Sequence, residues 1–152
     1  MWCAVVLDGA GTCRGPGLRC RHANDSSHGR PLMVARIGQW TLDVVDGARM
    51  AQFWAAALGY RIDDDGQHLW PPPEAGPHAP SVWLQPVAEP TPGKNRGHPD
   101  LSPEGDGEAE VERLVGLGAR RVEIGQAGTE GFVVLADPEG NEFCVFREPR
   151  GG

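Results

Sequence analysis

The chain has 152 residues, a net charge of −7 and 39% hydrophobic residues. This length allows one domain with a single sizeable core. Nucleic acid is excluded as the main partner, because phosphate contacts need clustered Lys and Arg, which an acidic chain lacks. A membrane-spanning helix is excluded, because no apolar run approaches the about 20 residues that such a helix needs, and we expect no membrane partner.

Residues 1–32 show no sustained hydrophobic period and are rich in Gly, Arg and Ser, which predicts a disordered N-terminal extension. A regular pattern begins at Met33, so a start-site artefact upstream is the alternative interpretation. The Cys and His residues here lack the close pairs of usual zinc modules. They are Cys3, Cys13, Cys20, His22 and His28. Reduced cysteines and the lack of an export signal predict a cytoplasmic protein.

The first half of the body predicts a strand, a helix and three further strands. Residues 37–45 alternate apolar and polar side chains, which indicates a half-buried strand. Asp46 is a suitable N-cap and Gly59 a natural helix stop. Between them, apolar residues recur at helical spacing, namely Met50, Phe53, Trp54, Ala57 and Leu58. The three further strands are predicted at residues 60–63, 67–70 and 81–87, the first two joined as a hairpin.

The second half repeats this order. It predicts a helix at residues 106–118 and strands at residues 98–102, 120–124, 132–136 and 142–146. The helix stops Gly59 and Gly118 lie 59 residues apart, and the same offset pairs Gln85 with Cys144. It also pairs Gln39 with His98. A common order with a common offset predicts an internal repeat.

The repeat predicts the fold class. We expect an α+β protein in which two tandem βαβββ modules, residues 36–87 and 97–148, form a curved mixed sheet around a cleft. Together they make up one domain, residues 33–150. Strand alternation puts polar side chains on the face opposite the helices, and burying them unpaired would cost about 1–3 kcal/mol each. A ligand-filled cleft avoids this cost. Its predicted lining is Gln39, Thr41, Asp43, Trp83, Gln85, His98, Asp100 and Cys144.

Three stretches, "DVVDGARMAQFWAAALGYRI", "KNRGHPDLSP" and "DPEGNEFCVF", occur in this order along the chain. With the duplicated element order, residues 34–148 resemble the vicinal oxygen chelate superfamily, which includes glyoxalase I, bleomycin-resistance proteins and extradiol dioxygenases. The resemblance implies a small-molecule ligand and a homodimer. It also implies that metal-binding members would use the positions Gln39, Gln85, His98 and Cys144 as ligands.

The residues at these four positions argue against the divalent metal site of the family. Gln85 and Cys144 stand where the resemblance implies carboxylates, so Mg²⁺, Mn²⁺ and Ni²⁺ lack their preferred donors. We therefore expect no cofactor and a degenerate metal site. Zinc bound through His98 and Cys144 is the alternative. Cys144 is interpreted as a small buried hydrophobic residue rather than a nucleophile.

The expected function is the binding of a small organic molecule by a glyoxalase-like protein. The alternative is a metal-dependent lyase, isomerase or dioxygenase that chelates neighbouring substrate oxygens. A module that binds another protein through its sheet face is a third hypothesis. Catalytic residues are not identified by any motif, and the candidates by position are His98, Asp100 and Glu142. Whether the protein is an enzyme, and on which substrate, stays open at this point.

Overall fold

The computed structural model describes residues 35–90, 92–93 and 95–150. Residues 36–152 form one compact unit, and the account below concerns that unit. The segment 1–32, for which we predict a disordered extension, lies outside the described residues together with its cysteines and histidines. None of the helices in the described part of the chain is long and apolar enough to cross a membrane.

The first module has the predicted order of elements. They are β1 (Gln39–Val44), α1 (Gly47–Leu58), β2 (Arg61–Ile62), β3 (His68–Trp70) and β4 (Ser81–Pro86), with a short 3-10 helix, η2 (Pro73–Ala75), before β4. Asp46 caps α1 by accepting the backbone N–H of Arg49. Gly59 ends the helix with a left-handed φ of 67°, which glycine adopts without a steric penalty. Both predicted caps are confirmed.

The second module repeats this order with β5 (Asp100–Leu101), α2 (Gly107–Leu117), β6 (Arg120–Arg121), β7 (Phe132–Ala136) and β8 (Glu142–Phe146). β7 and β8 have the predicted bounds, whereas β6 is shorter than predicted. The Gln126 side chain accepts the Ile124 N–H and donates to the Val122 C=O. A side chain that binds the backbone in this way competes with a strand ladder, which explains the early end of β6.

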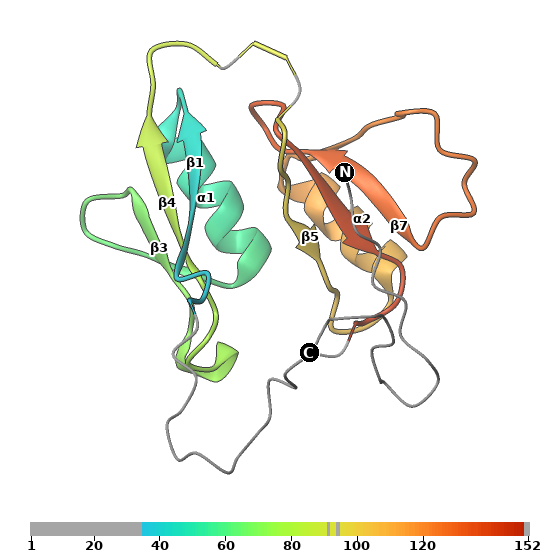
Figure 1. Ribbon diagram of the computed structural model, residues 1–152, viewed down its shortest axis with the longest axis horizontal. Helices are drawn as coiled ribbons and strands as arrows, with labels where there is room; N and C mark the ends of the chain where they lie inside the picture. The colour runs from blue at the N-terminus through green and yellow to red at the C-terminus, as the bar shows by residue number, and fades with distance from the viewer. Residues whose placement is uncertain (1–34, 91, 94, 151–152) are drawn as a thin grey trace, which may run out of the picture. The chain divides into compact units, whose positions relative to one another are not determined.

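The strands form two four-stranded mixed sheets, in the orders β1-β4-β3-β2 and β5-β8-β7-β6. In each sheet the first and last strands of the module pair in parallel and the others pair antiparallel. Figure 1 shows α1 beside β1 and β4, and α2 beside the sheet of the second module. The predicted fold class, an α+β protein of two tandem βαβββ modules, is confirmed.

The strand register shows where the two modules differ. In the first module Asp43 lies opposite Gln85, and in the second Asp100 lies opposite Cys144. Gln85 and Cys144 are 59 residues apart, but Asp43 and Asp100 are only 57 apart. The pairing of β5 with β8 is therefore shifted by two residues relative to the pairing of β1 with β4. This shift places Asp100 opposite Cys144.

One hydrophobic core joins the modules. The strand residues predicted to face the helices are buried in it or packed against it, namely Trp40, Leu42, Val44, Val82, Leu84, Leu101, Phe143 and Val145. Trp54 of α1 is 1% exposed, and its ring lies 4.9 Å from that of Trp40 and 5.2 Å from that of Phe143. Edge-to-face contacts of this kind stabilise a core beyond the burial of area alone. Because Trp40 and Phe143 belong to different modules, Trp54 connects the two sheets.

Candidate functional site

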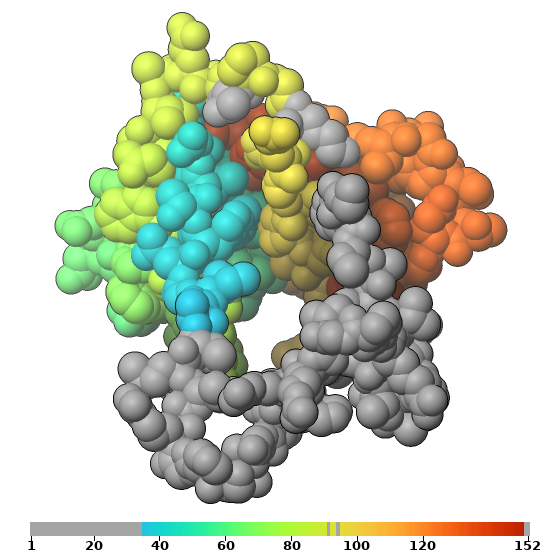
Figure 2. Space-filling model, in the orientation of Figure 1, coloured from blue at the N-terminus to red at the C-terminus, as the bar shows by residue number. Residues whose placement is uncertain are grey.

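A cavity of about 490 Å³ runs along β1. It lies between this strand, the turn before β8 and the linking segment, which is the stretch between the end of β4 at Pro86 and the start of β5 at Asp100. Figure 2 shows the linking segment, in yellow, next to the cyan surface of β1. The polar residues around the cavity include Thr41, Asp43, Asn95, Arg96, Asn141 and Glu142. Three of them, Thr41, Asp43 and Glu142, are among the site residues predicted from the sequence.

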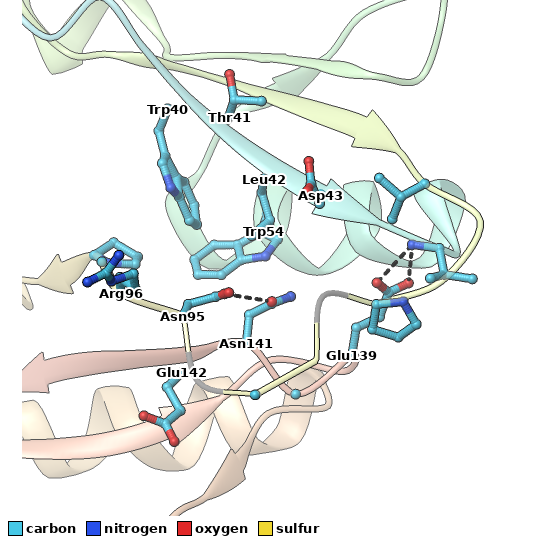
Figure 3. Close-up of a pocket in the computed structure, with 17 residues that line it drawn as sticks. Trp40, Thr41, Leu42, Asp43, Trp54, Asn95, Arg96, Glu139, Asn141 and Glu142 are labelled. Carbon is cyan, nitrogen blue, oxygen red and sulfur yellow. Dashed lines mark hydrogen bonds between the residues drawn. The ribbon is translucent and has the colours of Figure 1, made fainter.

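Two tryptophans form the apolar wall of this cavity. Figure 3 shows Trp40, Leu42 and Trp54 on one side of β1, whereas Thr41 and Asp43 point to the other side. The alternation follows from strand geometry, in which successive side chains point to opposite faces. Trp54 is held in place because its indole N–H donates to the Asp137 carboxylate across 3.2 Å. The cavity therefore has a rigid aromatic wall and a polar rim.

The turn before β8, residues 137–141, holds one end of the cavity together. The buried Asp137 carboxylate accepts the backbone N–H groups of Glu139 and Asn141, at 3.0 and 2.9 Å, and the Trp54 indole N–H. Burial raises the pKa of Asp137, and the hydrogen bonds from Asn141, Trp54 and Glu139 oppose that rise. Asn141 in turn accepts the Asn95 side-chain amide at 2.9 Å. The turn thus links α1, the linking segment and β8.

Glu139 closes the far end of β1. Its carboxylate accepts the Val45 backbone N–H at 2.9 Å and the Asp46 backbone N–H at 2.5 Å. These N–H groups precede the first turn of α1, where a negative charge is favourable because it meets the positive end of the helix dipole. The conspicuous sequence "DPEGN" therefore has a structural role in joining the modules.

His98, Asp100 and Cys144 form a second cluster, in the second module. One ligand atom from each lies within 4.8 Å of the others. His98 Nε2 lies 3.2 Å from Asp100 Oδ1, and the Cys144 backbone N–H donates to the Pro99 C=O at 3.0 Å. The Cys144 side chain is buried, with 6% of its surface exposed. Imidazole, carboxylate and thiolate are the donors that zinc takes in proteins, so the cluster fits zinc with three ligands.

The remaining predicted cleft residues bond within the first module. The Gln39 side-chain amide donates to the Thr41 hydroxyl at 3.3 Å. The Trp83 indole N–H donates to the Gln85 side-chain carbonyl at 3.2 Å. Two of the four family-equivalent metal positions, His98 and Cys144, belong to the His98, Asp100 and Cys144 cluster. Asp100 joins them through the shifted register of β5.

Sequence reasoning did not identify several residues of these surfaces. On β3, His68 lies against Trp70, with ring centres 4.0 Å apart, and its Nε2 is 2.9 Å from the Ser81 hydroxyl. Strand alternation around the buried Leu69 could have placed His68 and Trp70 on the polar face. No comparable signal existed for Asn95 and Arg96, because the linking segment has no periodic pattern.

A family model described as a glyoxalase-like domain matches residues 39–146, which is most of the chain and includes both modules. A search among curated proteins found no match.

Similar folds occur among solved structures. A glyoxalase/bleomycin resistance/dioxygenase family enzyme from Burkholderia phytofirmans has a TM-score of 0.54 at 15% identity, covering 73% of this chain and 97% of that one. A fosfomycin resistance protein from Mesorhizobium loti has a TM-score of 0.58 at 14% identity, with coverages of 76% and 93%. An antibiotic binding protein from a Streptomyces species has a TM-score of 0.51 at 15% identity, with coverages of 79% and 100%. At these identities the likeness concerns the fold.

Proposed function

The chain belongs to the glyoxalase-like domain family of the vicinal oxygen chelate superfamily, and from this premise we propose that it binds a small organic molecule in the cavity beside β1. The observation that carries the proposal is the composition of the cavity. An aromatic wall of Trp40 and Trp54 faces a rim with carboxylate, amide and guanidinium groups. Ligand sites in proteins typically combine apolar walls with a few polar groups that orient the ligand.

The cavity also has a suitable size. Its volume of about 490 Å³ falls in the range of about 300–1,000 Å³ that small-molecule sites occupy. Two proteins of similar fold are named for contact with antibiotics, one as an antibiotic binding protein and one as a fosfomycin resistance protein. These names support the choice of antibiotic-like molecules as the first compounds to test.

In this proposal the four-ligand metal site of the superfamily is degenerate. Gln39 and Gln85 are neutral amides, and their hydrogen bonds stay within the first module. Neutral amide oxygens are weak ligands compared with carboxylates. Ligand binding in the cavity beside β1 then requires no metal, and a chelator leaves the affinity unchanged.

The His98, Asp100 and Cys144 cluster favours a second candidate function, a metal-dependent lyase, isomerase or dioxygenase. These three residues would hold a zinc ion, which supplies Lewis-acid chemistry to neighbouring substrate oxygens when bound. His98 and Asp100, 3.2 Å apart, form an acid–base pair in which the carboxylate orients the imidazole. Glu142 lines the cavity beside β1 and serves as a candidate acid or base there.

We also propose that the protein forms a homodimer and that it is located in the cytoplasm. Sedimentation equilibrium tests the first, because a dimer has twice the 16.3 kDa mass of the chain. Fractionation of cells that express the chain tests the second point.

A thermal-shift screen of antibiotic-like and metabolite-like molecules tests the binding function. Gly97 lines the cavity, and a Cβ added there meets no atom within 4 Å, so Gly97→Trp introduces an indole into this region without a backbone clash. Gly131→Trp is the matched control, because Gly131 has the same free space but is not among the residues lining this cavity.

A molecule that binds the native state stabilises it by RT ln(1 + L/Kd), where L is the free ligand concentration, so the Tm rises with the logarithm of the ligand concentration over Kd. We expect ligands that shift the Tm of the unsubstituted protein and of Gly131→Trp but not of Gly97→Trp. Shifts that persist equally in Gly97→Trp would show that binding occurs elsewhere.

A further inference from the structure

The outer edge of β1 is open where it meets the cavity. Among the described residues, β1 is the end strand of its sheet and pairs only with β4. The Ser81 N–H donates to the Gly38 C=O, and the Val87 N–H donates to the Val44 C=O. In a parallel ladder every second residue bonds to the partner strand. Even-numbered residues of β1 therefore bond to β4, and the peptide groups of Thr41 and Asp43 point outward.

These outward peptide groups have no hydrogen-bond partner in the part of the chain that the structure describes. The next outward N–H, that of Val45, is accepted by the Glu139 carboxylate. Open edges invite pairing with another chain, and proteins generally cover or block them. Here the edge is blocked at Val45 and open at Thr41 and Asp43, beside the cavity of about 490 Å³.

Opposite charges flank the open edge. Asp43 and Arg96 are both exposed, and neither makes an ion pair or side-chain hydrogen bond among the described residues. Figure 3 shows Arg96 near the Trp40 end of the strand and Asp43 further along it. A ligand that carries an ammonium group at one end and a carboxylate at the other matches this arrangement in charge.

The spacing selects the length and direction of such a ligand. From Trp40 to Asp43 the strand rises about 10 Å, at about 3.3 Å per residue, which is the span of an extended tripeptide. With its ammonium group at Asp43 and its carboxylate at Arg96, the tripeptide runs antiparallel to β1. Residue 1 then lies opposite Asp43 and residue 3 opposite Thr41. In an antiparallel pair of this type the facing residues exchange N–H···O=C bonds.

We propose that the cavity beside β1 takes a short peptide-like molecule with a free ammonium and a free carboxylate, which docks as an added antiparallel strand on Thr41 and Asp43. This inference rests on the proposed binding function and names its ligand class. The backbone bonds supply affinity without regard to side chains, as in other cases of strand addition. The wall of Trp40 accommodates an apolar side chain of the ligand.

Titration of the full chain with the tripeptide Leu-Ala-Leu, followed by NMR of the backbone amides, tests the proposal. The N–H of ligand residue 3 donates to the Thr41 C=O, whereas the N–H of residue 2 points away from β1. Methylation of the residue 3 nitrogen therefore weakens binding about tenfold, because it removes one bond and adds a clash. Methylation of the residue 2 nitrogen is the matched control and leaves the affinity within about threefold. Equal effects of the two methylations would overturn strand addition.

Two protein variants test the same contacts from the other side. Arg96→Gln weakens the binding of Leu-Ala-Leu but leaves that of Leu-Ala-Leu-amide unchanged, because the amide lacks the charge that Arg96 binds. Thr41→Pro weakens the binding of Leu-Ala-Leu, because it removes one outward N–H that bonds to the ligand. The strand should still form, because an edge strand tolerates proline where its N–H faces outward. Thr41→Val keeps this N–H and is its control. If Thr41→Pro does not fold, the methylated peptides still decide the proposal.

The outcomes separate this inference from the proposed function. If Leu-Ala-Leu does not bind, while another molecule binds and is blocked by Gly97→Trp, the peptide proposal fails and the binding function stands. If Gly97→Trp blocks no ligand, including the tripeptide, both fail.

Discussion

The indole N–H of Trp54 donates to the carboxylate of Asp137 across 3.2 Å, although the two residues are 83 positions apart in the chain. Both side chains are buried, at 1% exposure each. This bond ties α1 of the first module to the turn before β8 of the second. It also fixes the aromatic wall of the cavity, so the stability of the domain and the shape of the site depend on the same contact.

Replacement of Asp137 should be strongly destabilising. Asp137→Ala leaves the Trp54 N–H and the Asn141 side chain without their acceptor, and each unsatisfied buried group costs about 1–3 kcal/mol. We expect the free energy of unfolding in urea to fall by at least about 2 kcal/mol. Asp65→Ala, in the exposed turn between β2 and β3, should leave it within about 0.5 kcal/mol. Equal effects would contradict the structural role of Asp137.

The pH dependence of stability should carry the signature of Asp137. Its pKa in the folded state is raised above the ordinary value of 3.8 because of burial. A raised carboxyl pKa means that the native state holds its proton more tightly than the unfolded state does, so stability falls as pH rises from about 4 through the folded pKa. Asp137→Asn removes this dependence. The free energy of unfolding in urea should therefore be measured for both proteins between pH 3 and pH 8. The value for the unsubstituted protein, relative to that for Asp137→Asn, should be highest at low pH and should fall as the pH rises.

Two glycines of α2 provide a matched test of the packing between α2 and the end of β8. A Cβ on Gly107 would overlap the Phe146 carbonyl oxygen and lie 2.6 Å from the Arg147 Cα. Because both are backbone atoms, Gly107→Ala should destabilise the protein by about 1–3 kcal/mol. Gly116→Ala meets no atom within 4 Å and should stabilise it by about 0.5–1 kcal/mol through helix propensity. Similar Tm changes in the two variants would contradict the close approach of α2 to β8.

Metal addition separates the two candidate functions. Mg²⁺ and Mn²⁺ should leave the Tm unchanged, because these hard cations need oxygen donors and the His98 cluster contains a single carboxylate. Zinc is the deciding ion: a metal-dependent enzyme predicts a rise in Tm that Cys144→Ser abolishes. Metal-free ligand binding instead predicts equal ligand affinity with and without a chelator. A stoichiometric shift with Mg²⁺ or Mn²⁺ would contradict our interpretation of the donor set.

Local sequence patterns predicted most of the fold. The apolar runs at residues 132–136 and 142–146 predicted the bounds of β7 and β8, and the helix stops at Gly59 and Gly118 were confirmed. The expected burial of Cys144 is confirmed as well. These features depend on neighbours within a few residues, so the order of side chains along the chain is sufficient to predict them.

Tertiary relationships were not accessible in this way. A fixed offset between the halves could not show that β5 is shifted by two residues, since strand register depends on packing between strands. The shift places Asp100 opposite Cys144. Likewise, nothing local indicates that Asn95 meets Asn141, or that Glu139 binds the end of β1. The cavity beside β1 is built from these contacts.

The central claim is that a small molecule binds beside β1, and mapping a bound ligand onto the backbone amides by NMR tests it most directly. For any molecule that raises the Tm, we predict the largest amide shifts at Thr41, Asp43 and Asn95, which border the cavity. Gly97→Trp should abolish these shifts. Largest shifts around His98 and Cys144, with Thr41 and Asp43 unaffected, would contradict the account and place the ligand at the metal-type cluster instead.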